Sequence, residues 1–336
     1  MRLRSIAATN RANVSTIAVA KAIAKFIATI IALWSPLGQA GELTVSAAEA
    51  EAHRVRLAAA GFDLMIERQL RLTRVDARIR IANAPLCTAS LAAVTGIVAR
   101  TADELPESFR DVAYERHAVG DLVKVLGVVP GFAGAESGVR VGDTILRVNG
   151  EETHLAASLD GRLRDPDQPL RLQIERDGAV FDLQLQPGKS IGCHRPAELL
   201  ALDVVDLYPQ RTSTANRVRV GTGMLRFLES DDELAILLAH ELAHSLLALE
   251  KLQPDARVDE TDADELGLYL AARAGFDVSG AVSLLQRLER ESPLAVGDRT
   301  GYAHPVTARR FEILESTADE IARKRKTGVP LMRTPR

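Results

Sequence analysis

The clearest pattern along the chain is a pair of helices in its second half. Residues 234–249 are apolar almost all round, which is typical of a buried helix. Ser230 and Glu233 have the spacing of a capping box, so we expect this helix to begin there. A second helix is predicted over residues 258–274, where Gly275 supplies the usual stop.

A separate region, residues 121–187, alternates apolar and polar positions with the period of β-strands. Asn149-Gly150 and Asp177-Gly178 are hairpin signals. We expect strands around these turns, at residues 123–129, within 138–150, at 170–176 and at 180–185. Together the patterns predict an α+β protein, in which a mainly helical domain with a small β-sheet carries an inserted β-rich domain.

The N-terminus has the pattern of an export signal. The first 40 residues hold five Lys or Arg and no acid, then an apolar run over 26–34 and a small-residue end at 38–40. This predicts a signal peptide that is cut after Ala40. If it stayed uncut, residues 17–34 would be a membrane anchor, which the two lysines within them disfavour. No later segment approaches the ~20 apolar residues of a transmembrane helix.

Residues 47–77 are rich in Ala, Arg and Leu and predict a long helix, interrupted at Gly61, that packs on the main domain. Cys87 and Cys193 are the only cysteines and flank the β-rich region. In an exported chain they predict a disulfide, with two free buried thiols as the alternative. After residue 40 there are 37 Lys or Arg against 45 Asp or Glu, which argues against nucleic acid as a partner. The basic end, 323–336, is interpreted as a solvated tail.

The first predicted helix carries a pattern that can bind a metal. His240 and His244 are four residues apart, so their imidazoles project from one helix face and can share an ion. Glu241 lies beside them, where a general base for a water molecule has to be. Zinc suits imidazole ligands and keeps one position open in catalytic sites. The alternative is a chance match, in which both histidines are ordinary core residues.

The second predicted helix is acidic, and spacing rather than acidity points to one ligand. Glu260, Ala263, Asp264 and Gly267 form one stripe, and its two small residues allow a close approach to the metal helix. We expect Glu260 to be the third ligand and Asp264 to hold the other ring nitrogen of a ligating histidine. A solvated acidic face is the alternative.

These motifs resemble the zinc metallopeptidase family that contains HtpX, BepA and the CAAX prenyl endopeptidases. The resemblance spans roughly residues 198–316 and is carried by segments 221–225, 240–244, 260–267, 274–277 and 304–310. It implies a zincin-type metalloprotease domain with one zinc per chain, and it suggests that His304 or Arg310 stabilises the oxyanion of the reaction. One departure is Gln210-Arg211, where the family usually has Asn-Ala, which affects how the substrate groove is lined.

The β-rich region resembles a PDZ domain of the bacterial protease-associated type. PDZ domains bind an extended peptide by adding it as a strand, often with its C-terminal carboxylate held by backbone amides. The alternative is a β domain that only spaces or shields the active site. The predicted parts are a signal peptide, an N-terminal helical segment, the PDZ domain, the catalytic domain and a basic tail, at residues 1–40, 41–107, 108–188, 189–322 and 323–336.

The sequence thus predicts a secreted or periplasmic zinc endopeptidase that acts on polypeptides, with misfolded envelope proteins as candidate substrates. Membrane contact is expected only if the signal stays uncleaved. One rival is a binding module, in which the PDZ region recruits partners and the helical part acts as a chaperone-like clamp. An intact Glu241 favours the enzyme. Another rival, a zinc hydrolase of non-protein amides, is disfavoured by the PDZ region.

Overall fold

The computed structural model describes residues 45–87, 90–153, 169–186, 188, 190–195, 197–200, 207–211, 216–250, 259–291 and 306–333. The chain divides into two units between Arg54 and Val55. The predicted export signal and His304 lie outside the described residues. Among the residues described, no helix combines the length and apolar character that a membrane span requires.

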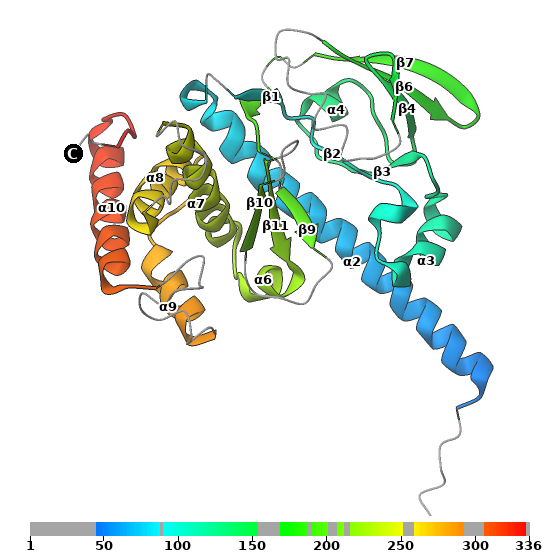
Figure 1. Ribbon diagram of the computed structural model, residues 1–336, viewed down its shortest axis with the longest axis horizontal. Coiled ribbons are helices and arrows are strands. Elements are labelled where there is room, and N and C mark those ends of the chain that lie inside the picture. The colour runs from blue at the N-terminus through cyan, green and yellow to red at the C-terminus, as the bar shows by residue number, and fades with distance from the viewer. Residues whose placement is uncertain are drawn as a thin grey trace, which may run out of the picture. The chain divides into compact units, whose positions relative to one another are not determined.

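The protein is α+β, as the sequence predicts (Figure 1). The helices are α2 (Ala47–Ala82), η1 (Ala84–Leu86), η2 (Ala102–Glu104), α3 (Glu107–His117), α4 (Ala133–Glu136), α6 (Thr222–Phe227), α7 (Asp231–Glu250), α8 (Glu260–Arg273), α9 (Ala281–Glu291) and α10 (Ala308–Thr327). The strands are β1 (Leu91–Ala93), β2 (Ile97–Arg100), β3 (Val123–Val128), β4 (Thr144–Val148), β5 (Glu151–Glu152), β6 (Leu170–Arg176), β7 (Ala179–Leu185), β8 (Ile191–Cys193), β9 (Ala197–Leu200), β10 (Leu207–Arg211) and β11 (Asn216–Gly221).

The largest sheet has six strands in the order β2-β3-β4-β6-β7, with β5 paired to β4. All four predicted strands are present, and both predicted hairpin turns have positive φ at each central residue, which suits Asn-Gly and Asp-Gly. The sheet also contains β2, which pairs antiparallel with β3. It therefore begins upstream of residue 108, where the sequence analysis placed the domain boundary. Short β-strands without strong alternation, such as β2, give little sequence signal.

Helix α2 is continuous through Gly61, so the predicted interruption is wrong. A Cβ at Gly61 would lie 3.1 Å from the ring of Phe109 in α3. The neighbouring Phe62 is fully buried, with its ring centroid 6.0 Å from that of Phe109. The glycine therefore serves close packing between two helices, and this packing offsets the helix-propensity cost of about 1 kcal/mol.

Helix α7 begins as its sequence predicts, with one difference in the cap. The backbone N–H of Glu233 donates to Oγ of Ser230 at 3.1 Å. The Glu233 carboxylate accepts from the backbone N–H of Glu229 at 2.8 Å, one residue earlier than a standard capping box. Arg287 of α9 also reaches this carboxylate, with Nη1 2.5 Å from Oε1. The start of α7 is thus held both by its own cap and by a side chain of α9.

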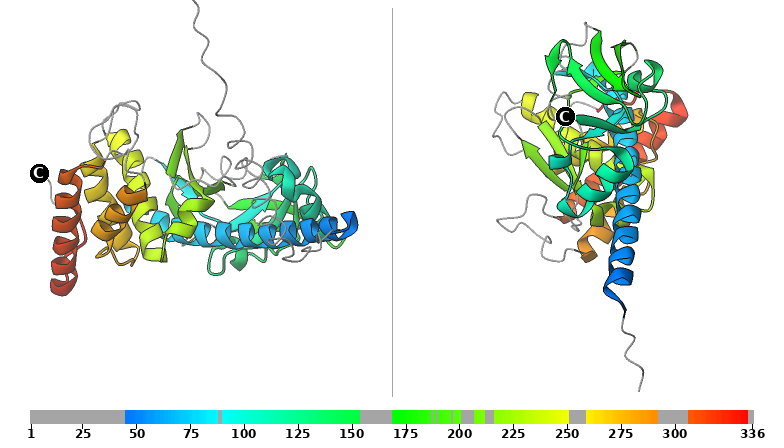
Figure 2. Two further views of the ribbon diagram at one scale, coloured as in Figure 1. Left: turned by 90° about the horizontal axis from the view of Figure 1, so that it is seen from below. Right: turned by 90° about the vertical axis from the view of Figure 1, so that its right-hand side faces the viewer.

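Helix α8 packs directly along α7, and the two lie side by side in both Figures 1 and 2. Asp259 caps it, because its carboxylate accepts from the backbone N–H of Thr261 at 2.7 Å. Gly275, with φ of 83°, follows its C-terminal end. At Gly267 a Cβ would lie 2.9 Å from both Cα and N of His240. Only glycine allows this approach of the two backbones.

Two arginines of α2 bind the first residue of α7. Arg71 Nε and Arg74 Nη2 lie 2.7 and 2.8 Å from the two carboxylate oxygens of Asp231. Burial raises the pKa of Asp231, but the hydrogen bonds from the two arginines outweigh it and lower the pKa. This half-exposed cluster links the long helix to the helix that carries the histidines.

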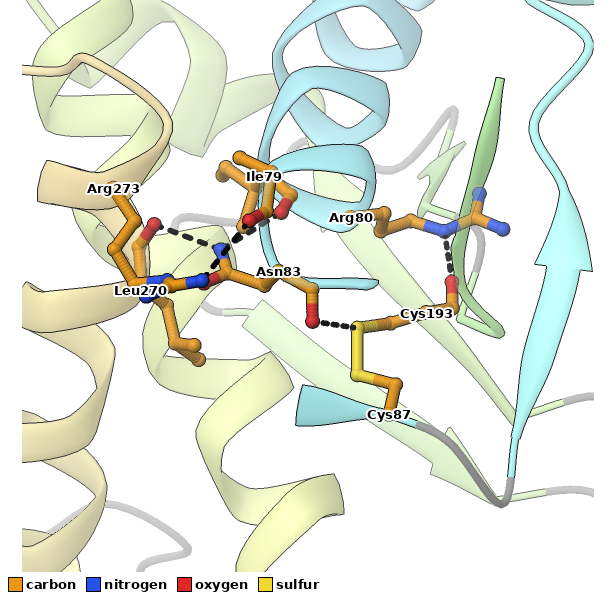
Figure 3. Close-up of a disulfide and its surroundings, with 8 residues drawn as sticks. Ile79, Arg80, Asn83, Cys87, Cys193, Leu270 and Arg273 are labelled. Atoms are coloured by element: carbon orange, nitrogen blue, oxygen red, sulfur yellow. Dashed lines mark hydrogen bonds between the residues drawn. A yellow bond between two sulfur atoms is a disulfide. The ribbon is translucent and has the colours of Figure 1, made fainter. Parts of the chain in front are cut away.

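The predicted disulfide between Cys87 and Cys193 is present, with a Cα–Cα distance of 5.3 Å (Figure 3). It joins the segment that follows α2 to strand β8. Asn83, fully buried beside it, donates from Nδ2 to the carbonyls of Ile79 and Leu270 at 2.8 and 2.9 Å. The bond therefore closes a buried junction between α2, β8 and α8.

The C-terminal end departs from the predicted solvated tail. Helix α10 runs to Thr327, so the first residues of this segment are helical. Beyond it, Arg333 lies 2.9 Å from Asp262 and 3.0 Å from Glu265, two acids of α8. The basic composition of the segment thus complements the acidic helix on which it folds.

Candidate metal centre

The structure brings the three predicted ligands together. His240 and His244 project from one face of α7 with their Nε2 atoms 3.0 Å apart. Glu260, in the first turn of α8, places Oε2 3.4 Å from Nε2 of His240 and Oε1 3.3 Å from Nε2 of His244. The three donors form a group of ligand atoms that all lie within 4.8 Å of one another.

The spacing and chemistry of these donors fit a zinc ion. Two ligands held at about 2.0–2.1 Å by a tetrahedral zinc lie about 3.3 Å from each other. The separations of 3.0, 3.3 and 3.4 Å in this group agree with that value. Two imidazoles and one carboxylate are also a donor set that catalytic zinc sites use. The arrangement can therefore hold a metal without moving the helices.

The buried ion pair of Asp264 and Arg310 holds the metal-binding group in place. The carboxylate of Asp264 lies 2.9 Å from Nδ1 of His240, so it orients the imidazole. Arg310 of α10 donates two hydrogen bonds to the same carboxylate, from Nε at 2.6 Å and from Nη2 at 2.8 Å. Nη1 of Arg310 also lies 3.2 Å from Glu260. One guanidinium thus fixes two acids whose mutual repulsion it offsets.

The same contacts shift the pKa values of the site. Burial lowers the pKa of His240, but hydrogen bonds to Asp264 and Glu260 outweigh it and raise the pKa to about 9. Burial lowers the pKa of His244. Burial raises the pKa of Asp264, but hydrogen bonds to His240 and Arg310 outweigh it and lower the pKa. A cation that binds here therefore competes with a proton for the imidazole of His240.

Glu241, next to His240 on α7, is 1% exposed. A carboxylate so deeply placed needs nearby positive charge. Two buried arginines supply it, because the charge of Glu241 acts to raise the pKa of both Arg195 and Arg310, although burial is the largest influence on each and lowers it. Arg195, in the loop after β8, also donates from Nη2 to the backbone carbonyl of Leu238 at 2.8 Å.

The sequence analysis located some of these residues and missed others. The structure brings His240, His244 and Glu260 into contact with one another and Asp264 into contact with His240, whereas their roles stay predictions. Arg310 is buried and occupied by two acids, so its geometry favours positioning of the ligands over contact with an oxyanion. His304, the other candidate for the oxyanion, lies outside the described residues.

Arg195 was missed because the sequence gives no signal for it. It lies in a loop 45 residues before His240, outside every motif, and nothing in its neighbours marks it as buried. Its place depends on the pairing of β8 with β1 and on the disulfide, neither of which is a local property.

No family model matches the chain. It is similar to the mitochondrial metalloendopeptidase OMA1 of Schizosaccharomyces pombe, with 33% identity over 92 residues. The match spans 27% of this chain and 27% of the length of that relative. It is therefore a weak relation to a metalloendopeptidase over about a quarter of each protein.

Two solved structures are similar to part of the chain. The HtrA3 PDZ domain bound to a phage-derived ligand is 23% identical, with a TM-score of 0.23, and the match covers 28% of this chain and 84% of that one. The HtrA-type protease AlgW with a decapeptide is 19% identical, with a TM-score of 0.25, over 31% of this chain and 30% of that one. Likenesses at these TM-scores carry no argument, so what the chain offers by its own geometry is a group of two histidines and a glutamate that can hold a metal.

Proposed function

We propose that this protein is an exported zinc-dependent endopeptidase that cleaves polypeptides. The observation that carries the proposal is the placement of His240, His244 and Glu260 at the donor spacing of a tetrahedral zinc, with Glu241 next to them on the same helix. The partial similarity to a metalloendopeptidase agrees with it.

In this mechanism each residue has one task. When bound, zinc polarises the scissile carbonyl and makes water more acidic. Glu241 accepts the proton of the attacking water and returns it to the leaving amine. Asp264 keeps the imidazole of His240 in one orientation, and Arg310 holds Asp264 and Glu260 in place. The low exposure of Glu241 excludes bulk water from the group that moves the proton.

The test compares the wild-type protein with Glu241→Gln, which keeps the ligands and removes the base. Both proteins should bind one zinc per chain. The variant should cleave unfolded casein roughly 10²- to 10⁴-fold more slowly, and chelation should abolish wild-type activity. Equal rates for the two proteins would reject the mechanism. Wild-type protein that binds zinc and unfolded chains without cleaving them would instead indicate the chaperone-like clamp.

We also propose that the large sheet captures peptides. Its sequence resembles PDZ domains. Among the residues that the structure describes, β2 ends the strand order of the sheet, so it is an edge strand to which an extended peptide could add. Calorimetric titration with peptides that end in an apolar residue tests this, with the same peptides amidated at the C-terminus as controls. Binding of the free-acid form alone supports capture of a terminal carboxylate. Binding of neither form indicates a spacer domain.

Export is proposed on two grounds. The N-terminal pattern predicts a signal peptide, and the Cys87–Cys193 disulfide is typical of an oxidising compartment. Mass spectrometry of the protein from the envelope fraction should find a mature N-terminus after Ala40. A chain that keeps residues 1–40 would favour the membrane-anchored alternative.

A further inference from the structure

The interior of the protein contains a cation that the proposed chemistry does not use. Arg195 is 1% exposed, and it is among the largest fully buried side chains of the described residues. A charged group is kept in such a place only when other charges and hydrogen bonds compensate it. The contacts of Arg195 therefore indicate what it does.

Those contacts point to the helix that carries the metal group. The guanidinium donates from Nη2 to the carbonyl of Leu238 at 2.8 Å. A helix carbonyl points toward the residue four positions ahead, so this guanidinium lies against the turn that contains Glu241. Burial lowers the pKa of the Arg195 guanidinium to about 10, and the positive charge of Arg80 adds to this, whereas the negative charges of Glu241 and then Asp76 act in the opposite direction.

The backbone of Arg195 is fixed by the disulfide junction. The carbonyl of Cys193 accepts from the backbone N–H of Arg195 at 3.0 Å. The same carbonyl accepts from Nε of Arg80 at 2.5 Å (Figure 3). Arg80 is itself paired with Asp76 at 3.3 Å. Arg195 is thus two residues from a covalent bond, its backbone is held at the disulfide junction, and its side chain reaches α7 at the carbonyl of Leu238.

We infer that Arg195 is a positioning residue for Glu241, in which its buried positive charge holds the carboxylate in place and the Cys87–Cys193 bond holds the arginine. The inference rests on the proposed peptidase function for its catalytic consequence. Its electrostatic part, the coupling of the two side chains, stands without that function.

The catalytic consequence is tested with Arg195→Met and Arg195→Lys in the zinc-loaded full chain. Arg195→Met should lower kcat roughly 10- to 100-fold with KM within about twofold and zinc content unchanged. Arg195→Lys should restore part of the loss, because it keeps the charge. Arg287→Met is the matched control, since Arg287 also holds α7 but contacts Glu233 and the Phe227 carbonyl at its start; its kcat should stay at the wild-type value.

The coupling is measured by denaturant unfolding of metal-free protein. Arg195→Met should lower the unfolding midpoint, because it removes one of the two buried arginines that act on Glu241, and in a Glu241→Gln background this loss should fall by half or more. The same cycle with Arg287→Met should be additive. If the Arg195→Met variant does not fold by itself but the double variant with Glu241→Gln does, the coupling between the two side chains is strong and the inference is supported. Additive Arg195 and Glu241 effects, or failure of both variants to fold, would reject the inference.

The two tests separate two failures. A zinc-loaded wild-type protein that cleaves nothing would refute the proposed function, while the unfolding cycle would still decide whether Arg195 holds Glu241. An active wild type whose Arg195→Met variant retains full kcat would overturn the positioning role and leave the proposed function standing.

Discussion

The contact between α7 and α8 makes Gly267 a position where a small change should reach the metal group. Replacing it by alanine adds one methyl group 2.9 Å from Cα and N of His240 and 3.3 Å from the carbonyl carbon of Ala239. These are backbone atoms, so no side-chain rotation relieves the contact. Since ordinary contacts of this kind begin at 3.4 Å, the two helices must separate by about 0.5 Å or more.

Two opposing effects set the change in stability. Overpacking of this kind costs about 1–3 kcal/mol, and alanine gains about 1 kcal/mol over glycine in a helix interior. The net loss should be about 0–2 kcal/mol. The effect on metal binding should be larger, because Glu260 lies two turns earlier on the same stripe and metal–ligand distances tolerate only about 0.2 Å. We expect zinc affinity to fall roughly 10- to 100-fold.

Zinc affinity is measured by competition with a chelator of known affinity, and stability by thermal unfolding of metal-free protein. Gly280→Ala is the matched control, because a Cβ there meets no atom within 4 Å. Its zinc affinity should equal that of the wild type. Unchanged affinity in Gly267→Ala would show that the helices do not need this close approach, and that the ligand geometry is set elsewhere.

Three further predictions address the ligand set, the link to α2 and the disulfide. Glu260→Ala should abolish stoichiometric zinc binding by metal analysis; full occupancy would move the ligand role to another acid of α8. Because its folded-state pKa is lowered, Asp231 should stabilise the protein above about pH 4 and lose that contribution as the pH falls further. Arg71→Ala should therefore flatten the acid side of the stability profile measured by urea unfolding, and an unchanged profile would exclude this ion pair as a source. Replacing both Cys87 and Cys193 by alanine opens a loop with a sequence separation of 106 and should cost about 4–5 kcal/mol; a midpoint shift close to zero would contradict the chain-entropy account.

Most of the features that the sequence predicted correctly depend on residues close together in the chain. The spacing of His240 and His244 fixes their common face on any helix, and the small residues around Glu260 indicate which acid can approach them. The hairpins at Asn149 and Asp177 were equally local, because these turns require positive φ.

What could not be predicted depends on contacts between distant segments. Gly61 has the composition of a helix break, yet its place is decided by the ring of Phe109 in another helix. The short strand β2 becomes part of the large sheet only through its pairing with β3. The burial of Arg195 follows from a disulfide and a two-stranded sheet that join residues about a hundred positions apart.

The contact of Arg333 with α8 has a practical consequence for anyone who handles this protein. Asp262 and Glu265 flank Asp264 on the helix that carries Glu260, and Arg333 neutralises both. A preparation in which proteolysis removes the segment that holds Arg333 would leave two like charges one turn apart on that helix. Such a preparation would be a mixture of molecules in which α8 differs in stability, so the integrity of this segment should be checked by mass spectrometry before zinc affinities are compared.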